Sequence, residues 1–355
     1  MKRILLVAAE ESGSLHALHL IKELKGLGEY SFIGAGSLWL SREMQVEIPA
    51  GDLSFVGMEE PRKIIRIFKA YRKLKRIGEE CDGAILIDYP GMNLRLASHM
   101  KKLHKPVCYY VAPQLWAWGE WRINRLKKSV NALVCLFPFE EDFFRAHSVN
   151  AKFFGHPLVE RLSPLKNFPK AAHIALLPGS RESEVSKLLP VMLKAVEKIG
   201  LPAIIVKAPH IPNRLYGKIP PWAKIVPFEE RYRYMAQSSA AIAASGTATL
   251  ELSILGIPTV VVYKTSPISW HIGRRLVKVN FISIVNILAG REVFPECLQE
   301  ECTPQRIEKR LLSLLDPVHA ERIKAITEEI TKRLKGISPY KRAAEFFHET
   351  LSKTT

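Results

Sequence analysis

The sequence predicts an α/β protein built from two successive doubly wound domains, and two features of the chain carry this prediction. Apolar runs of strand length alternate with helical patterns, which is typical of mostly parallel sheets. The alternation loosens at the prolines between residues 163 and 169 and then starts again. We therefore expect two Rossmann-like domains facing across a cleft, at 1–165 and 166–338. The last helix, at 339–355, would return either to the N-terminal domain or to a partner chain.

The expected elements follow from apolar spacing. Strands of the first half are expected at 4–8, 31–33, 84–87, 107–111 and 132–136, with a helix at 15–25. Strands of the second half are expected at 174–177, 203–206, 240–243 and 258–262, before a helical tail at 304–353. Open α/β sheets bind ligands at the carboxyl ends of their strands, so polar residues there are candidates for function. The loop after the first strand supplies Glu10 and Ser12.

Composition limits the class of protein. The chain has 355 residues, of which 47% are hydrophobic and 25% charged, as in globular proteins. No apolar run reaches the roughly 18–20 residues needed to cross a bilayer. Glu10 and Glu11 interrupt the apolar start too early for a signal peptide, so it is interpreted as a buried strand. Five dispersed cysteines without metal-ligand spacing favour a reducing cytoplasm and predict neither a metal nor another cofactor.

The formal charge of +17 points to an anionic partner. Nucleic acid, an anionic membrane surface and phosphorylated substrates all fit the charge, and a generally basic proteome would also explain it. A nucleic-acid-binding protein would show affinity that falls steeply with salt. The chain carries no recognised nucleic-acid motif, so we expect no nucleic-acid partner.

A basic amphipathic segment at 61–77 contains eight Lys or Arg residues and no acid. Such a helix can lie in a membrane interface, with its apolar face down and its cations near lipid phosphates. The alternative is a helix that packs on the sheet and keeps a solvated basic face. The apolar stretch just before it favours the membrane slightly. The candidate membrane-binding residues are Phe55, Val56, Arg66, Phe68 and Lys69.

Asp88 directly follows a buried apolar run, at the carboxyl tip of an expected strand. A carboxylate in that position, facing a cleft, suits general-base catalysis. A capping role for the turn near Asn93 is the alternative, and Asn93 is itself a candidate acceptor-binding residue.

Aromatic and histidine residues mark two further places. Three tryptophans lie within six residues from Trp116 onward, and they could form buried packing or shape a pocket for a sugar or an acyl chain. His156 lies at the expected hinge, where a histidine is either structural or faces the cleft.

Two turns in the second half have the chemistry of phosphate binding. Gly179, Ser180 and Arg181 follow an apolar strand and precede a helical pattern, so backbone N–H groups, a helix dipole and a guanidinium could meet one anion. A second set of small residues, Ser245, Gly246 and Thr247, follows another strand. An ordinary strand-to-helix turn is the alternative for each, but the pair is most simply explained by a diphosphate.

Three residues beyond these turns complete the candidate site. Glu251 lies one helical turn beyond Thr247, where it could accept hydrogen bonds from two ribose hydroxyls or be a surface charge. Asn286 could hold either a ligand or a backbone turn, and Arg291 could pair with Glu292 or face the cleft. The absence of a Walker motif and of a convincing dinucleotide fingerprint argues against a P-loop nucleotidase or a dinucleotide enzyme.

Five motifs in order resemble the lipid-A-disaccharide synthase family of glycosyltransferases. They are Y-V-A-P-Q-L-W-A-W at 110–118, F-x-G-H-P-L-V at 153–159, L-L-P-G-S-R-x-x-E-V at 176–185, A-S-G-T-A-T-L-E at 244–251 and N-I-L-A-G-R-E at 286–292. The resemblance implies a GT-B fold and an inverting transferase that is cytoplasmic and peripheral on the inner membrane. Its substrates would be UDP-2,3-diacylglucosamine and 2,3-diacylglucosamine 1-phosphate, and its products the β-1,6 disaccharide 1-phosphate and UDP.

The resemblance also implies roles for residues. Asp88 matches the family's essential aspartate and would be the general base, and Arg181 would neutralise the leaving UDP. Glu10 and Ser12 match the first-loop motif, although Ser14 and Gly91 stand where the family usually has acids. A homodimer is plausible on the same grounds, and no metal is required. A GT-B enzyme with another acceptor, a UDP-N-acetylglucosamine epimerase and a UDP-binding relative without catalysis are the alternatives.

Overall fold

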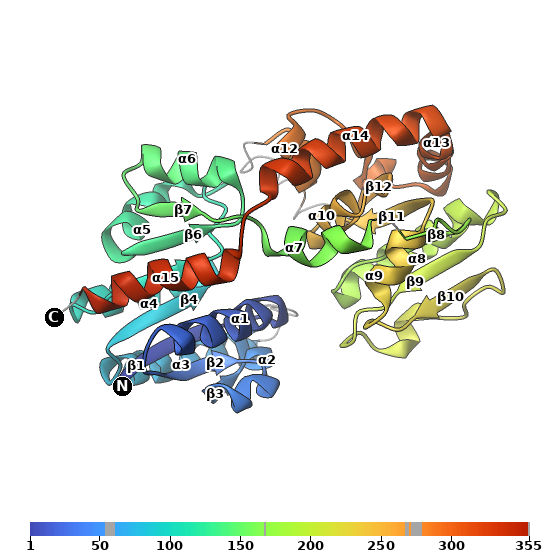
Figure 1. The fold of residues 1–355 in the computed structure, drawn as a ribbon. Helices are drawn as coiled ribbons and strands as arrows, with labels where there is room; N and C mark the ends of the chain where they lie inside the picture. The colour runs from blue at the N-terminus through green and yellow to red at the C-terminus, as the bar shows by residue number, and fades with distance from the viewer. Residues whose placement is uncertain (54–60, 167, 267–269, 271–278, 354–355) are drawn as a thin grey trace. The chain divides into compact units, whose positions relative to one another are not determined.

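The structure is a computed structural model, and it describes residues 1–53, 61–166, 168–266, 270 and 279–353 (Figure 1). The chain forms two compact units. The first comprises Met1–Pro157 with Gly336–Thr355, and the second comprises Leu158–Lys335. No helix in the described ranges is long and apolar enough to cross a membrane.

The divisions between the units fall at Pro157 and Lys335 rather than at residues 165 and 338. Helix α7 (Pro157–Leu162) explains the first difference, because it packs into the second unit. The guanidinium of Arg161 on this helix lies 4.9 Å from the ring centre of Tyr232.

The N-terminal unit contains a seven-stranded parallel sheet of order β3-β2-β1-β4-β5-β6-β7. The strand order changes direction between β1 and β4, which creates a topological switch point. The strands are β1 (Lys2–Ala8), β2 (Tyr30–Gly36), β3 (Gln45–Pro49), β4 (Gly83–Ile87), β5 (Val107–Tyr110), β6 (Ala132–Cys135) and β7 (Ala151–Phe153).

Helices cover both faces of this sheet because strand side chains alternate between two apolar cores. Leu5 and Val7 join one core and Ile4 and Leu6 the other. The first core is covered by α3 (Pro61–Glu79), α4 (Pro90–Lys102), α5 (Ile123–Ser129) and α6 (Pro138–Ala146). The second core is covered by α1 (Glu11–Leu27) and α15 (Pro339–Ser352). A short α2 (Ala50–Leu53) follows β3.

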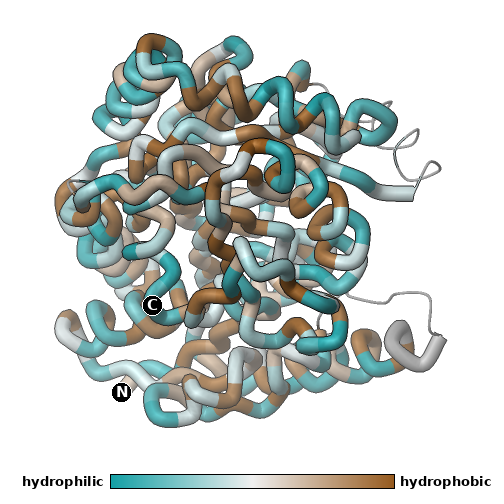
Figure 2. The backbone as a smooth tube through the Cα atoms, turned by 90° about the vertical axis from the view of Figure 1, so that its right-hand side faces the viewer, coloured by the Kyte–Doolittle hydropathy of each residue, from teal (hydrophilic) through white to brown (hydrophobic). Residues whose placement is uncertain are grey.

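Helix α15 packs on the N-terminal unit, which is one of the two positions that the sequence left open for the C-terminal segment. It packs against α1, β5 and β6 of the N-terminal unit. Its buried residues are Pro339, Ala343, Ala344, Phe347 and Leu351. In Figure 2 the helices alternate between brown and teal along their length, as amphipathic helices do.

The C-terminal unit contains a six-stranded parallel sheet of order β10-β9-β8-β11-β12-β13, with its switch point between β8 and β11. The strands are β8 (Ile174–Leu177), β9 (Ala203–Val206), β10 (Ala223–Val226), β11 (Ala240–Ala244), β12 (Thr259–Tyr263) and β13 (Glu296–Leu298). The helices after α7 are α8 (Glu182–Glu197), α9 (Arg231–Gln237), α10 (Thr247–Ile254), α12 (Ile284–Ala289), α13 (Pro304–Leu315) and α14 (Pro317–Leu334).

The parallel alternation is confirmed, and the differences are local. The loop expected between the first strand and the helix at 15–25 is largely helical, because α1 begins at Glu11. Gly13 lies buried in this first turn, where an added Cβ would make ordinary van der Waals contact with Ala8 and Ile87 at 3.6 Å. The sequence analysis did not assign β3, β7, β10 and β13, which are strands of three to five residues.

Candidate active site

The switch point of the N-terminal sheet brings Glu10 and Asp88 to neighbouring strand ends. Ala8 of β1 pairs with Ile87 of β4, so the residues that follow them leave the same edge of the sheet. Glu10 is the N-cap of α1. Burial raises the pKa of Asp88 to about 6; a hydrogen bond from the Tyr89 backbone opposes the rise, and the Glu10 carboxylate adds to it. Asp88 can therefore change protonation state close to neutral pH.

Asp88 sits in a strained turn that its neighbours hold in place. Asp88 and Tyr89 have φ angles of 49° and 52°, in the left-handed region. The Asp88 N–H donates to Tyr110 O over 2.9 Å, and the Tyr109 hydroxyl donates to Asp88 O over 2.5 Å. Strain of this kind persists only where the surroundings over-determine the backbone, and it is common at functional sites.

Asn93 lies beneath this turn rather than at the surface. Its side chain is fully buried, and Nδ2 donates to the carbonyls of Ile87 and Asp88 over 3.1 and 2.8 Å. In the structure Asn93 therefore holds the Asp88 backbone.

The first turn of α1 carries an unexpected carboxylate network. Ser12 is exposed, whereas Ser14 is fully buried and accepts a hydrogen bond from Ser37 N over 2.9 Å. Glu11 accepts from the Ser37 hydroxyl and from Trp39 Nε1, both over 2.5 Å. Glu11 thus brings a negative charge next to Ser14, the position where the family resemblance leads one to expect an acid.

Trp116 is fixed by Glu140, a residue that the sequence analysis missed. Trp116 Nε1 donates to Glu140 Oε1 over 3.0 Å, and the N–H groups of Leu136 and Phe137 donate to Glu140 Oε2 over 3.1 and 3.2 Å. Burial raises the pKa of Glu140 to about 7; these hydrogen bonds oppose the rise, and the Asp88 charge adds to it. Proline at the start of a helix with an acid in its first turn is a helix-start signal that could have drawn attention to Glu140.

His156 is buried, and its ring centre lies 5.6 Å from that of Phe137. Burial lowers its pKa to about 3, with a smaller contribution from His16, so the imidazole is neutral at physiological pH. A neutral ring suits packing or hydrogen bonding better than charge stabilisation.

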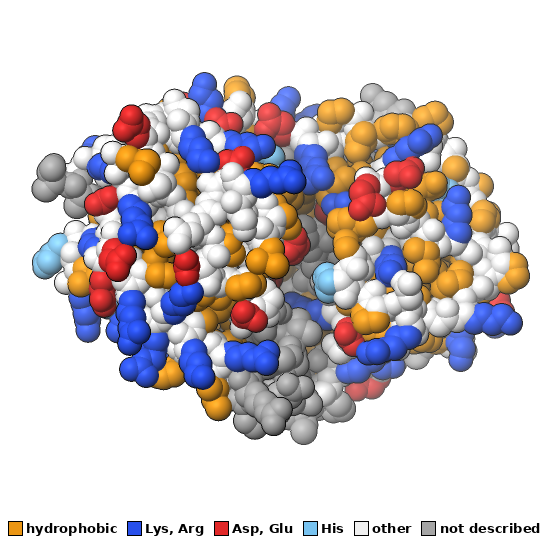
Figure 3. Space-filling view, turned by 90° about the horizontal axis from the view of Figure 1, so that it is seen from below, with side chains coloured by type: hydrophobic (Ala, Val, Ile, Leu, Met, Phe, Trp, Pro, Cys, Tyr) orange, Lys and Arg blue, Asp and Glu red, His pale blue; other side chains and the backbone are white. Residues whose placement is uncertain are grey.

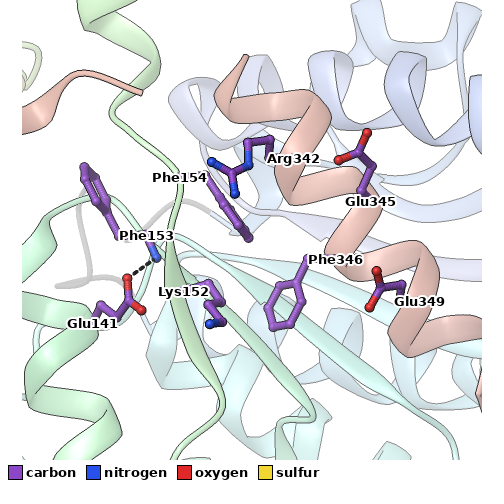
Figure 4. A pocket seen from close by; sticks show the side chains of 8 residues that line it. All are labelled: Glu141, Lys152, Phe153, Phe154, Arg342, Glu345, Phe346 and Glu349. Carbon is purple, nitrogen blue, oxygen red and sulfur yellow. Dashed lines mark hydrogen bonds between the residues drawn. The ribbon is translucent and has the colours of Figure 1, made fainter. Parts of the chain in front are cut away.

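A cavity of about 380 Å³ lies between β7 and α15 of the N-terminal unit (Figure 4). Phe153, Phe154 and Phe346 supply apolar lining, and charged side chains such as Arg342 surround them. Glu141 accepts a hydrogen bond from Phe153 N over 2.8 Å at this place. None of the residues proposed for the site from the sequence is among the described residues that line the cavity.

The switch point of the C-terminal sheet brings the two phosphate-type turns together. Leu177 of β8 pairs with Ala243 of β11, so both turns leave adjacent strand ends. Gly179 and Gly246 have φ angles of +111° and +155°, which side chains rarely adopt. Helices α8 and α10 begin directly after these turns, as the sequence predicted.

Two N–H groups of the first turn, Gly179–Arg181, already bond to Glu184 of the helix α8 that follows it. Glu184 accepts from Ser180 N over 3.0 Å and from Arg181 N over 3.2 Å. The Arg181 guanidinium, whose side chain is 60% exposed, donates to Glu184 over 2.8 Å. The donors expected to bind an anion therefore already hold a carboxylate.

The second turn remains accessible. Gly246 and Thr247 are exposed, and the Ser245 hydroxyl donates to Ile282 O over 3.0 Å. Glu251, one turn into α10, accepts a hydrogen bond from the Tyr232 hydroxyl over 2.7 Å. Burial raises the pKa of Glu251, while Tyr232, Arg231 and Arg161 oppose that rise.

Asn286 is buried, and both the nitrogen and the oxygen of its side-chain amide form hydrogen bonds within the C-terminal unit. Nδ2 donates to Phe294 O and to Glu296 Oε1 over 2.8 and 2.9 Å, and Oδ1 accepts from the N–H groups of Val293 and Phe294 over 2.8 and 2.9 Å. Of its two expected roles, the structure gives it the backbone turn.

Arg291 is exposed next to that turn. Its neighbour Glu292 lies 3.8 Å from Arg310, which makes Arg310 the ion-pair partner of Glu292 in the structure.

Helix α3 exposes part of the predicted membrane-binding set. Arg66, Phe68 and Lys69 are exposed, with Phe68 at 58%. Figure 3 shows many Lys and Arg side chains over the lower left of the view. Phe55 and Val56 lie outside the described residues. The described part of the chain contains no cluster of three or more metal-ligating side chains.

Two successive Rossmann-like units, each with polar loops at its switch point, define a protein of the GT-B class. Solved structures bear this out. The calicheamicin glycosyltransferase aligns with a TM-score of 0.62 at 14% identity, covering 100% of this chain and 99% of that one. Acinetobacter baumannii MurG aligns with a TM-score of 0.61 at 16% identity, covering 98% and 100%. At these identities the likeness establishes the fold.

The chain belongs to the lipid-A-disaccharide synthetase family, whose model matches residues 4–349. The lipid-A-disaccharide synthase of Myxococcus xanthus is 37% identical over 98% of this chain and 97% of its own length. The corresponding protein of Geobacter metallireducens is 34% identical over 99% and 98%.

Proposed function

We propose that this protein transfers 2,3-diacylglucosamine from its UDP derivative to the 6-hydroxyl of 2,3-diacylglucosamine 1-phosphate. The bond from the donor's anomeric carbon to the UDP oxygen breaks, and a β-1,6 bond to the acceptor oxygen forms. The acceptor hydroxyl loses its proton and UDP leaves. The observation that carries the proposal is the family match over residues 4–349.

Asp88 is the proposed general base. Its pKa of about 6 leaves it mostly ionised at neutral pH yet basic enough to accept a proton as the acceptor oxygen attacks. The Glu10 carboxylate at the neighbouring strand end raises the pKa of Asp88 and so supports that basicity. Trp116, held by Glu140, and Ser12, on the same edge of the sheet, are the proposed acceptor contacts. His156, which packs on Phe137, is proposed as a further sugar contact with a neutral ring.

The C-terminal unit is the proposed donor site. The diphosphate would lie at the adjacent turns of Gly179–Arg181 and Ser245–Thr247, where helix N-termini and a guanidinium stabilise negative charge. Arg181 would leave Glu184 for the departing UDP, and Glu251 would accept hydrogen bonds from the ribose. Asn286 acts indirectly through the turn that precedes β13, beside Arg291.

The exposed face of α3 is the proposed contact with the inner surface of the cytoplasmic membrane. Arg66 and Lys69 would approach lipid phosphates while Phe68 enters the interface, and each well-placed cation contributes about 1 kcal/mol. A homodimer stays a prediction of the family resemblance, and light scattering of the purified protein tests it.

Turnover tests the proposal. The full chain is incubated with both lipid substrates in detergent, and UDP and the disaccharide product are followed. Product is expected from the wild type and from Asp142→Asn, an exposed control on α6, but not from Asp88→Asn, which keeps the UDP affinity within a few-fold. Absence of both UDP binding and product in the wild type would overturn the proposal.

A further inference from the structure

We infer that Tyr232 is a positioning residue of the donor site, which orients the Glu251 carboxylate toward the vicinal hydroxyls of the nucleotide ribose. The inference rests on the donor site proposed above. It adds a residue on a different element, α9, which contributes no motif to the family resemblance.

A directed chain of hydrogen bonds links α9 to α10. Arg231 NH2 donates to the Tyr232 hydroxyl over 3.0 Å, and that hydroxyl donates to Glu251 Oε1 over 2.7 Å. Because the Tyr232 oxygen accepts from a guanidinium, its own hydrogen is directed to the carboxylate. Tyr232 is only 8% exposed, so its ring has little freedom to move the hydroxyl elsewhere.

Two cations lie against the ring of Tyr232 and oppose the burial that raises the pKa of Glu251. The guanidinium of Arg231 lies 4.1 Å from the Tyr232 ring centre, and that of Arg161 lies 4.9 Å from it. Arg231 also packs on Phe228, 3.6 Å from its ring centre. Positive charge on both arginines favours the ionised form of Glu251, which is the form that accepts hydrogen bonds from two hydroxyls.

The position of Glu251 fits a ribose. It lies four residues beyond Thr247, which is about 6 Å along the helix axis from the turn proposed for the phosphates. The hydrogen bonds between described residues use Oε1 and leave Oε2 for a ligand. A carboxylate already held by Tyr232 loses less rotamer freedom when the nucleotide binds, so the hydroxyl of Tyr232 contributes to affinity through Glu251.

The test removes the Tyr232 hydroxyl and the ribose hydroxyls separately. Calorimetry on the full chain measures the binding of UDP and of 2′,3′-dideoxy-UDP to the wild type and to Tyr232→Phe. The variant is expected to bind UDP about tenfold more weakly, as for one hydrogen bond to a charged group, and dideoxy-UDP within about twofold of the wild type. A purely structural role would weaken both ligands equally, and that result would overturn the inference.

Two more variants sharpen the test. Tyr234→Phe makes the same change on the same helix and should leave the affinities for both ligands unchanged. Lys224 Nζ lies 5.0 Å from the centre of the Tyr234 ring. Glu251→Gln should show the UDP-selective loss, and adding Tyr232→Phe to it should cost little more, because both act on one contact. Fully additive losses would contradict the coupling. A wild type that does not bind UDP would overturn the donor site itself, a result distinct from equal losses on both ligands.

Discussion

Glu184 accepts hydrogen bonds from both the backbone and the side chain of Arg181. The backbone N–H donates to Oε2 over 3.2 Å, and the guanidinium donates to Oε1 over 2.8 Å. Ser180 N adds a third bond to Oε2 over 3.0 Å. The first phosphate-type turn therefore holds a carboxylate of its own helix, which a phosphate would have to displace or join.

Glu184→Gln should consequently tighten UDP binding. The substitution removes a negative charge from the phosphate position, and we expect an affinity gain of about three- to tenfold by calorimetry. It also weakens the cap of α8, at a cost of about 1 kcal/mol in the free energy of unfolding. Glu182→Gln, in the same turn and half exposed, is the matched control. Weaker UDP binding in Glu184→Gln would show that the carboxylate shapes the turn instead of competing for it.

The pKa of Asp88 sets the pH profile of transfer. A general base must be ionised, so kcat/KM should rise with pH up to about 6 and then level off. Glu10→Gln removes a nearby negative charge and should move the midpoint of the remaining activity to lower pH. Rates measured from pH 4.5 to 8.5 test both points. A profile that is flat through pH 6 would assign the proton to another group.

The same shift predicts that Asp88→Asn stabilises the fold. The carboxyl has a folded pKa of about 6 against an ordinary pKa of 3.8, so the folded state binds its proton more tightly than the unfolded state. Wild-type stability therefore falls as pH rises from about 4 to 6, by up to about 3 kcal/mol. Asparagine removes this cost and tolerates the left-handed backbone. Urea unfolding should show the variant more stable at pH 8 and equal to the wild type at pH 4; equal stability at pH 8 would contradict the shift.

Strand ends and turn chemistry were predictable from the sequence because they depend on local spacing. Asp88, Arg181 and Thr247 each lie where an apolar run gives way to a helix. Because the strands are parallel, each residue then lies at the edge of its own sheet where the strands end. Side-chain partners were not predictable, because they depend on contacts between elements. Trp116 meets Glu140 at a separation of 24 residues, and Tyr232 meets Glu251 at a separation of 19.

The same limit explains the two asparagines. The sequence made Asn93 a candidate acceptor contact and left Asn286 open between a ligand and a backbone turn. In the structure both side chains are fully buried and bond to backbone groups. A polar residue at a strand end or in a motif can serve a ligand either directly or by fixing the loop that does. The burial of the side chain distinguishes the two roles, and burial cannot be read from the linear sequence.

Glu140→Gln tests whether the loop that carries Trp116 is held from α6. An amide cannot accept from the two backbone N–H groups and from the indole as a carboxylate does, so one side of the network must fail. We expect a loss of about 1–3 kcal/mol in the free energy of unfolding and a higher KM for the acceptor, with the UDP affinity unchanged.

Gly179→Ala should separate backbone strain from a specific collision. Gly179 has φ +111°, and a side chain there would lie 2.8 Å from Glu184 Cβ, inside the phosphate-type turn. Gly200 also has a positive φ, +74°, but has nothing within 4 Å of the added atom. Both alanine variants should lose about 1–2 kcal/mol of stability from the left-handed backbone. Only Gly179→Ala should also weaken UDP binding, by tenfold or more, because it displaces the turn. The same UDP affinity in the two variants, measured by calorimetry under conditions where both are folded, would remove this turn from the donor site and leave the second turn to bind the diphosphate alone.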